Sequence, residues 1–352
     1  MPPAARCGRA VQYGWPVSVF AAATGIGSWP GSAPREAAEI VVGELHRLPH
    51  LVELPARGVG ADLIGRAGAL LVDIAIDTVP RGYRIAARPG SVIRRAKSLL
   101  DEDVDAIEEA WEKAGGPGSG RPVKVQAPGP ITLAAQLELG NGHRALTDAG
   151  AVRDITASLA EGVARHRAEL ARRLATTVVV QYDEPVLAAA LAGRLTGVSA
   201  LNPVHPVDEA VAIGLLDECV AGAGAEVLLH SCAPGLPWNV LQRSAIHAVS
   251  VDASTLADAD FDGLGEFLDC GRAVVFGLVP TSAPAARPSA EEVAAAAVAI
   301  TDRIGFSRSS VRDRVGISPA CGLAGATAAW ARVAVGLCQR AAAAVGEDPE
   351  AI

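Results

Sequence analysis

The sequence predicts a single (β/α)₈ barrel whose functional site lies at the C-terminal ends of the strands. Eight strand-like runs alternate with helical segments along the 352 residues, and barrels of this kind commonly occupy that length as one unit. Polar residues follow at least six of these runs, whereas an open doubly wound sheet would gather its site at one crevice. No G-x-G-x-x-G sequence opens a helix after the first run, which disfavours a dinucleotide-binding fold.

Composition and charge exclude several classes of protein. Half of the residues are hydrophobic and 20% are charged, so the chain can bury a large core and is not globally disordered. The net charge of -8 and the lack of a dense basic run argue against a nucleic-acid partner. No uninterrupted apolar stretch is as long as a membrane span. The six cysteines are sparse and irregularly spaced, which favours a reducing cytoplasmic location over a secreted disulfide scaffold.

The eight runs set the expected domain boundaries. Residues 1–20 are expected to form a flexible extension, and residues 21–348 the barrel. The predicted strands are a run ending near Ile26, then 51–55, 123–126, 177–182, 226–232, 248–253, 273–278 and 315–317. Residues 81–120 are the least regular part, with an extra strand at 83–87 and an acidic helix at 101–114, and they carry no obvious chemistry.

Four residues at strand ends suggest a metal site. His230 and Cys232 form an H-x-C pair, and residues two apart in a strand point to the same side. Asp252 ends the run 248–253, and Cys321 ends the longer strand-like stretch 315–323 that begins with the eighth run. Two thiolates with an imidazole and an oxygen ligand suit Zn²⁺. Ligands from separate strands form no compact knuckle, so the zinc is expected to face substrate. A centre this rich in negative charge is suited to holding a substrate thiol as its thiolate.

The motifs IGSWP, QYDEP, LLHSC, VSVDAS and ISPACGL resemble, in this order, those of the catalytic barrel of cobalamin-independent methionine synthase. The resemblance runs from about residue 24 to 345. It implies a methyltransferase that activates a homocysteine-like thiol with zinc. It further implies roles for individual residues: His230, Cys232 and Cys321 as zinc ligands with Asp252 in place of a glutamate, Asp183 for the substrate amino group, and the backbone of Ile26 and Ser28 for its carboxylate end.

The departures from this family concern the methyl donor. The family has a folate-stacking tryptophan a few residues after a G-P-V-T motif, whereas GPIT is followed here by Ala134, Ala135 and Gln136. The family also has a proton-donating histidine after the seventh strand, where this chain has residues 277–280 with the sequence GLVP. The resemblance therefore implies a small-molecule thiol as one substrate and leaves the donor open between a folate and a corrinoid.

Other interpretations of the same residues stay open. Single cysteines are often simply buried, and Asp183 and Glu184 could cap the helix that Pro185 begins. Glu53 could recognise the substrate or pair with Arg57. Two further functional classes fit a barrel: a non-catalytic protein that binds zinc and a thiol metabolite, and a metal-free, decarboxylase-like enzyme in which the cysteine motifs are accidental.

Overall fold

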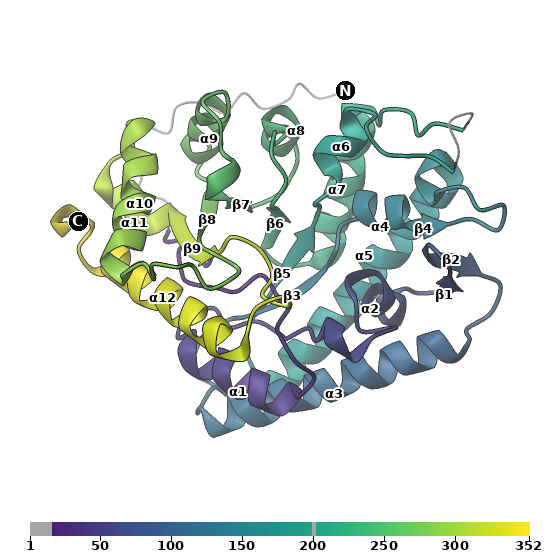
Figure 1. The fold of residues 1–352 in the computed structure, drawn as a ribbon, viewed down its shortest axis with the longest axis horizontal. Helices are drawn as coiled ribbons and strands as arrows, with labels where there is room; N and C mark the ends of the chain where they lie inside the picture. Colours follow the sequence, from purple (N-terminus) through teal and green to yellow (C-terminus); the bar gives the residue numbers. More distant parts are fainter. Residues whose placement is uncertain (1–15, 199–201) are drawn as a thin grey trace.

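A parallel sheet of six strands forms the centre of the protein (Figure 1). The computed structural model describes residues 16–198 and 202–352. The strands neighbour one another in chain order, so each crossover leads to the next strand of the sheet. They are β3 (Val123–Pro128), β5 (Val178–Asp183), β6 (Val227–Ser231), β7 (Ala248–Asp252), β8 (Ala273–Val279) and β9 (Val315–Pro319).

The alternation of side chains along each strand divides the core into two parts. In β5, Val178, Val180 and Tyr182 belong to the large apolar core on the helical side of the sheet. Val179 belongs to a smaller cluster on the other face of the sheet, which also contains Phe20, Ala22, Leu48, Leu228, Ala248, Ala273 and Val275. Residues that continue this second face toward the strand ends, such as Gln181 and Asp183, are therefore directed to the inside of the curled sheet.

Two extended segments lie between the edge strands β9 and β3. Isolated parallel bridges join Ala23 to Ile317, Ser28 to Glu53, and His50 to Lys124. Both segments are predicted from the sequence to be strands, and the structure has single bridges there instead of ladders. Proline and glycine explain the difference, because Pro49 and Pro55 have no N–H to donate and Gly27 has a φ of 145°.

Helices cover the outside of the sheet (Figure 1). Two caps follow local sequence signals: Asp148 accepts a hydrogen bond at the start of α5, and Ser289 forms a capping box with Glu292 at the start of α10. The α-helices are α1 (Pro34–Glu44), α2 (Leu63–Leu70), α3 (Ser91–Lys113), α4 (Pro130–Gln136), α5 (Ala149–Leu174), α6 (Leu187–Leu191), α7 (Glu209–Ala223), α8 (Trp238–Arg243), α9 (Asp260–Asp269), α10 (Ala290–Arg303), α11 (Arg308–Arg314) and α12 (Ala328–Glu347).

The irregular region of the sequence forms a hairpin and one long helix. Strands β1 (Ala75–Val79) and β2 (Gly82–Ala86) pair antiparallel, and the two-residue strand β4 (Leu137–Glu138) adds to β2 in parallel. Helix α3 begins at Ser91, ten residues before the predicted acidic helix, and packs against α1 and α2.

Residues 1–15, most of the predicted extension, lie outside the described residues, and Phe20 at its end is fully buried in the inner cluster. None of the helices in the described ranges has the length and apolarity needed to cross a bilayer.

Helix α5 approaches the end of α2 so closely that only glycine fits at the contact. A Cβ atom on Gly162 would lie 1.9 Å from the carbonyl oxygen of Leu70, which is a backbone atom and cannot rotate away. We therefore expect Gly162→Ala to lower the free energy of unfolding by about 1–3 kcal/mol, the usual cost of overpacking. Urea-induced unfolding measures this change.

Gly214 provides the matched control, because it also lies inside a helix, is exposed, and has open space where a Cβ would stand. Gly214→Ala should raise the stability by up to about 1 kcal/mol. If Gly162→Ala were as stable as the wild type or more stable, the contact between Gly162 and Leu70 would not fix the two helices.

Candidate functional site

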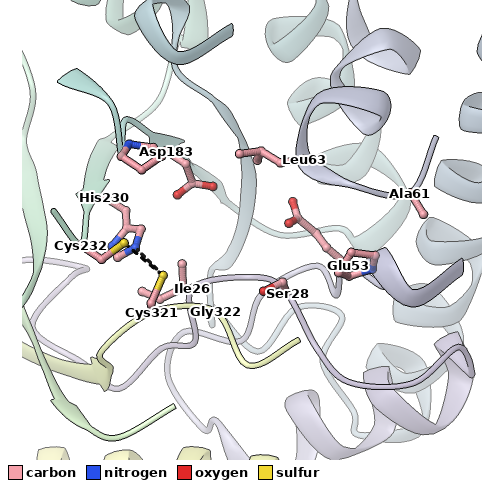
Figure 2. A pocket seen from close by; sticks show the side chains of 12 residues that line it. Ile26, Ser28, Glu53, Ala61, Leu63, Asp183, His230, Cys232, Cys321 and Gly322 are labelled. Carbon is pink, nitrogen blue, oxygen red and sulfur yellow. Dashed lines mark hydrogen bonds between the residues drawn. The ribbon is translucent and has the colours of Figure 1, made fainter. Parts of the chain in front are cut away.

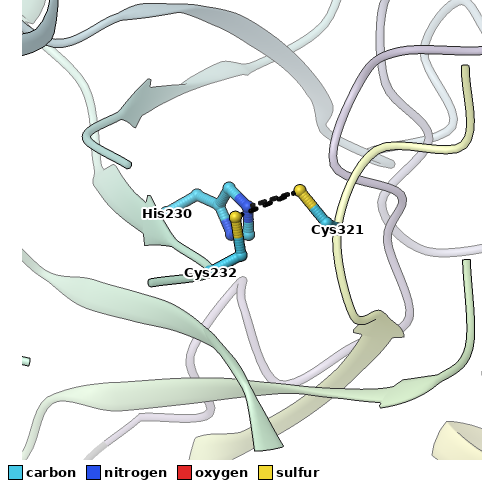
Figure 3. Close-up of side chains that lie close together, drawn as sticks. All are labelled: His230, Cys232 and Cys321. Carbon is cyan, nitrogen blue, oxygen red and sulfur yellow. Dashed lines mark hydrogen bonds between the residues drawn. The ribbon is translucent and has the colours of Figure 1, made fainter. Parts of the chain in front are cut away.

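Three potential metal ligands meet at the C-terminal ends of β6 and β9 (Figure 3). One ligand atom from each of His230, Cys232 and Cys321 lies within 4.8 Å of the others. The Cys321 sulfur is 3.6 Å from His230 Nε2 and 3.3 Å from the Cys232 sulfur. The H-x-C spacing therefore does bring both side chains to one side of the strand end, as the sequence predicts.

These separations fit a single zinc ion. Tetrahedral zinc with Zn–S bonds of about 2.3 Å and Zn–N bonds of about 2.0 Å holds its ligand atoms about 3.5–3.8 Å apart. The observed distances of 3.3 and 3.6 Å are close to this range, and the donors are the nitrogen and sulfur atoms that zinc prefers.

The His230 ring is oriented by its neighbour in the sheet. Ser250 is the register partner of His230 in β7, and its Oγ lies 3.2 Å from His230 Nδ1. This contact leaves Nε2 facing Cys321. Histidine ligands of metals are commonly held in this way through the ring nitrogen that does not bind the metal.

The two thiols influence each other's acidity. Cys321 donates a hydrogen bond to the Cys232 sulfur, which lowers the pKa of Cys232 to about 7 and raises that of Cys321 to about 12. Burial of Cys321 adds to the increase. Cys232 is therefore the sulfur of the pair that ionises first, and thiolates are the form that binds metals.

Asp252 stands apart from this group of three. It ends β7 as predicted, and its Oδ1 accepts hydrogen bonds from the backbone N–H of Ser254 at 2.9 Å and from the Ser254 hydroxyl at 2.6 Å. Its charge still acts on the site, because it opposes the ionisation of Cys232.

The three ligands open onto a cavity of about 270 Å³ (Figure 2). Four other residues that the sequence analysis singles out, namely Ile26, Ser28, Glu53 and Asp183, line this cavity as well. Figure 2 shows the carboxylates of Glu53 and Asp183 facing the same space as the sulfur atoms. The remaining lining residues are Pro185 and Gly322, which belong to the QYDEP and ISPACGL motifs, and Pro55, Ala61 and Leu63, which carry no strong sequence signal.

Glu53 is buried without a full partner. Its Oε1 makes no hydrogen bond to any described residue, and its nearest cation is Arg66, at 3.7 Å. Burial raises the pKa of Glu53 to about 7 against the opposing effect of Arg66. The predicted alternative, a pair with Arg57, is not formed, because Arg57 binds Glu102 and Asp103.

Asp183 is also buried and is held by a neighbour on its own strand. Gln181 Nε2 donates to Asp183 Oδ1 at 2.7 Å. Burial raises the pKa of Asp183, while the positive charges of His230 and Lys124 oppose this shift. Asp183 does not cap the following helix, because the cap position of α6 is Val186 and no side chain caps that helix.

Glu184 caps a different helix from the one expected. Its carboxylate accepts from the backbone N–H groups of Ile131 and Thr132, at 2.8 and 2.9 Å, and from the Thr132 hydroxyl. These groups lie at the start of α4 and not in the segment after Pro185. Neighbouring strands place Glu184 beside the GPIT motif, a contact that local sequence patterns do not contain.

The segment that carries Ile26 and Ser28 packs closely against the loop that carries Cys321. The N–H of Leu323 donates to the carbonyl of Ser28 at 2.9 Å, and a Cβ on Gly322 would lie 2.0 Å from Ser28 Oγ. The glycine of the C-G-L motif thus allows the loop to pass directly over Ser28.

Sequence reasoning missed two buried polar residues beneath the cavity, Lys124 and Gln181, which are both fully buried. A charged residue inside a strand-like run, VKVQ, is the signal that could have found the first of them. The second is two residues before Asp183 and therefore shares its face.

Comparisons with known proteins identify the family of the chain. The family model described as "Cobalamin-independent synthase, Catalytic domain" matches residues 20–344. The structure of a B12-independent methionine synthase from Shewanella sp., in complex with selenomethionine, is similar with a TM-score of 0.58. The two sequences are 14% identical, and the match covers 95% of this chain and 100% of the Shewanella chain. At this identity the likeness supports the fold alone. No curated protein matches the sequence. The family match, together with its extent, shows that the chain belongs to the cobalamin-independent methionine synthase family, a family of methyltransferases.

Proposed function

We propose that this protein is a zinc-dependent methyltransferase that transfers a methyl group to the sulfur of homocysteine or a closely related thiol amino acid. The observation that carries the proposal is one cavity wall that combines His230, Cys232 and Cys321 with two buried carboxylates. Family membership supports the reaction type. A metal-free barrel has less support, because the imidazole and both sulfurs converge at the spacing of a zinc site.

The zinc ligands would be His230, Cys232 and Cys321, with Asp252 as the fourth. Zinc bound there supplies the positive charge that keeps a substrate sulfur ionised near neutral pH. Asp252 would reach the metal by leaving Ser254 or through a bridging water. Its position at the end of β7, near enough to affect Cys232, supports this assignment.

The two carboxylates would recognise the amino group of the substrate. An ammonium group between Glu53 and Asp183 would compensate for their burial and favour their ionised forms. The backbone of Ile26 and Ser28 would bind the carboxylate end, so that the side-chain sulfur is directed toward the cysteines. Charge-assisted hydrogen bonds of this kind fix orientation as well as affinity.

Transfer would proceed by direct displacement. The substrate thiolate attacks the methyl carbon, a C–S bond forms, and the bond from that carbon to the donor breaks with its electrons remaining on the donor. A folate nitrogen or the cobalt of a corrinoid could serve as the donor atom. The residues of the chain would hold the thiolate and the methyl donor in position and exclude water from the site.

The two bridged N-terminal segments also take part in the proposed architecture. We count them as the first and second strands of the eight-stranded barrel that the sequence predicts. The bridges at Ala23, Ser28 and His50 support this arrangement, because they connect the edge strands in the order that a closed barrel requires.

Zinc binding tests the centre of the proposal. Purified wild-type protein should contain about one zinc per chain. Loss of a hydrogen bond to a metal ligand lowers metal affinity roughly 10- to 100-fold. Cys321→Ser removes a ligand itself, so its zinc affinity should fall by more than this. Competition with a chelator measures the affinity. Cys338→Ala is the control, since Cys338 is a buried thiol of α12 outside the cluster, and it should keep its zinc. Equal zinc affinity in all three proteins would refute the ligand assignment.

Asp252 also caps the short 3₁₀ helix Ala253–Thr255 by accepting the hydrogen bond from the N–H of Ser254, and Asp252→Asn separates metal binding from this cap. Asparagine still accepts a hydrogen bond from Ser254 but lacks the negative charge, so stability should change by less than about 0.5 kcal/mol. Zinc affinity should fall, by less than in Cys321→Ser. Unchanged affinity in the chelator competition would assign Asp252 to the cap alone.

Glu53→Gln and Asp183→Asn test substrate recognition. Each removes a charge-assisted contact to the ammonium group, worth about 1.5–3 kcal/mol, so KM for homocysteine should rise about 10- to 100-fold. Zinc content should remain that of the wild type. Glu138→Gln serves as the control, because Glu138 pairs with Arg81 outside this cavity. An unchanged KM in both cavity variants would contradict the assignment.

A further inference from the structure

A buried lysine and glutamine lie directly beneath the candidate site and do not line the cavity themselves. Lys124 is on β3 and Gln181 on the adjacent strand β5, and both side chains are fully buried. Lys124 is the register partner of Val179 in the inner cluster, and Gln181 lies on the same face of β5 between Val179 and Asp183 of the cavity wall. A lysine this deep requires an explanation, because burial of an ammonium group is costly.

Their hydrogen bonds form one continuous chain. Lys124 Nζ donates to Gln181 Oε1 at 2.6 Å, and Gln181 Nε2 donates both to Asp183 Oδ1 and to the carbonyl oxygen of Ile26, each at 2.7 Å. Lys124 Nζ is also 3.4 Å from that carbonyl. The same amide group therefore connects Asp183 to the segment that carries Ile26 and Ser28.

The lysine determines which way the amide faces. The charged lysine has donors only, so it requires the oxygen of the Gln181 amide on its side, and the NH₂ group must then point to the two acceptors. A flipped amide would set its oxygen against a carboxylate and a carbonyl, and its NH₂ group against the ammonium. Burial lowers the pKa of Lys124 to about 7, and the carboxylates of Asp183 and Glu53 act in the opposite direction.

We propose that Lys124 and Gln181 are positioning residues that hold the Asp183 carboxylate and the Ile26–Ser28 segment at the separation required by an α-amino acid. The inference rests on the proposed function, in which these two elements bind the ammonium and carboxylate ends of the thiol substrate. It extends that function by assigning the discrimination between an amino-acid thiol and a simple thiol to a pair that does not contact substrate.

A purely structural role would not require these residue types. Unbranched apolar side chains such as methionine occupy similar space, and replacing all members of a buried charged cluster by apolar side chains is often neutral or stabilising. Gln181, which is held by Lys124, instead donates to the Asp183 carboxylate and to the backbone carbonyl of Ile26, and both of these residues line the cavity.

The test compares two thiols on zinc-loaded protein: homocysteine and 4-sulfanylbutanoate, which lacks only the amino group. Titration calorimetry gives both dissociation constants for the wild type, Lys124→Met and Gln181→Met. The preference of the wild type for homocysteine should fall by about 10-fold or more in each variant, the value of one charge-assisted contact. Affinity for 4-sulfanylbutanoate and zinc content should stay within about 2-fold of the wild type, well under the 1.4 kcal/mol that a 10-fold change represents.

The outcomes separate this inference from the proposed function. Equal weakening of both thiols would assign the pair a general structural role, and an unchanged preference would show that Asp183 is positioned without it. Either result overturns the inference and leaves thiol binding intact. If the zinc-loaded wild type binds neither thiol, the proposed function fails, and the inference fails with it.

Discussion

The curvature of the parallel sheet is the constraint on which the candidate site depends. Strands β6 and β9 are separated by β7 and β8, so in a flat sheet they would be three spacings of about 4.8 Å, or about 14 Å, apart. Yet the Cys321 sulfur is 3.6 Å from His230 Nε2. Curling of the sheet, together with inward-directed side chains, removes this separation. The metal-binding group is therefore a property of the whole sheet and not of one motif.

The same curvature buries charge at the strand ends. Glu53, Asp183 and Lys124 lie close together inside the sheet, and burial shifts the pKa of each toward its neutral form. Attraction between Lys124 and the two carboxylates limits these shifts, whereas repulsion from Asp183 adds to the shift of Glu53. A cavity lined by two poorly compensated carboxylates provides a natural place for an ammonium group, and its other walls are largely apolar. The proposed selection for a cationic end on the substrate rests on this arrangement of buried charge.

The sequence predicted what depends on local periodicity. Strands β5 to β9, the strand-end positions of His230, Cys232 and Asp183, and the segment of Ile26 and Ser28 follow from apolar runs and from the residues that end them. Contacts between strands were not predictable in this way. Glu184 caps α4 from the neighbouring strand, and Lys124 meets Gln181 across 57 residues. The two N-terminal runs lack ladders because glycine and proline interrupt them, although their apolar content resembles that of the other strands.

Zinc-edge absorption spectroscopy of the purified protein, with and without homocysteine, would show whether the site binds zinc and a substrate thiol. We expect a zinc ion bound by two sulfur atoms and lighter ligands, which gains one sulfur neighbour when homocysteine is added. An unchanged zinc environment in the presence of saturating homocysteine would contradict thiol activation. Absence of zinc from protein prepared without chelator would contradict the metal site itself and leave only the fold.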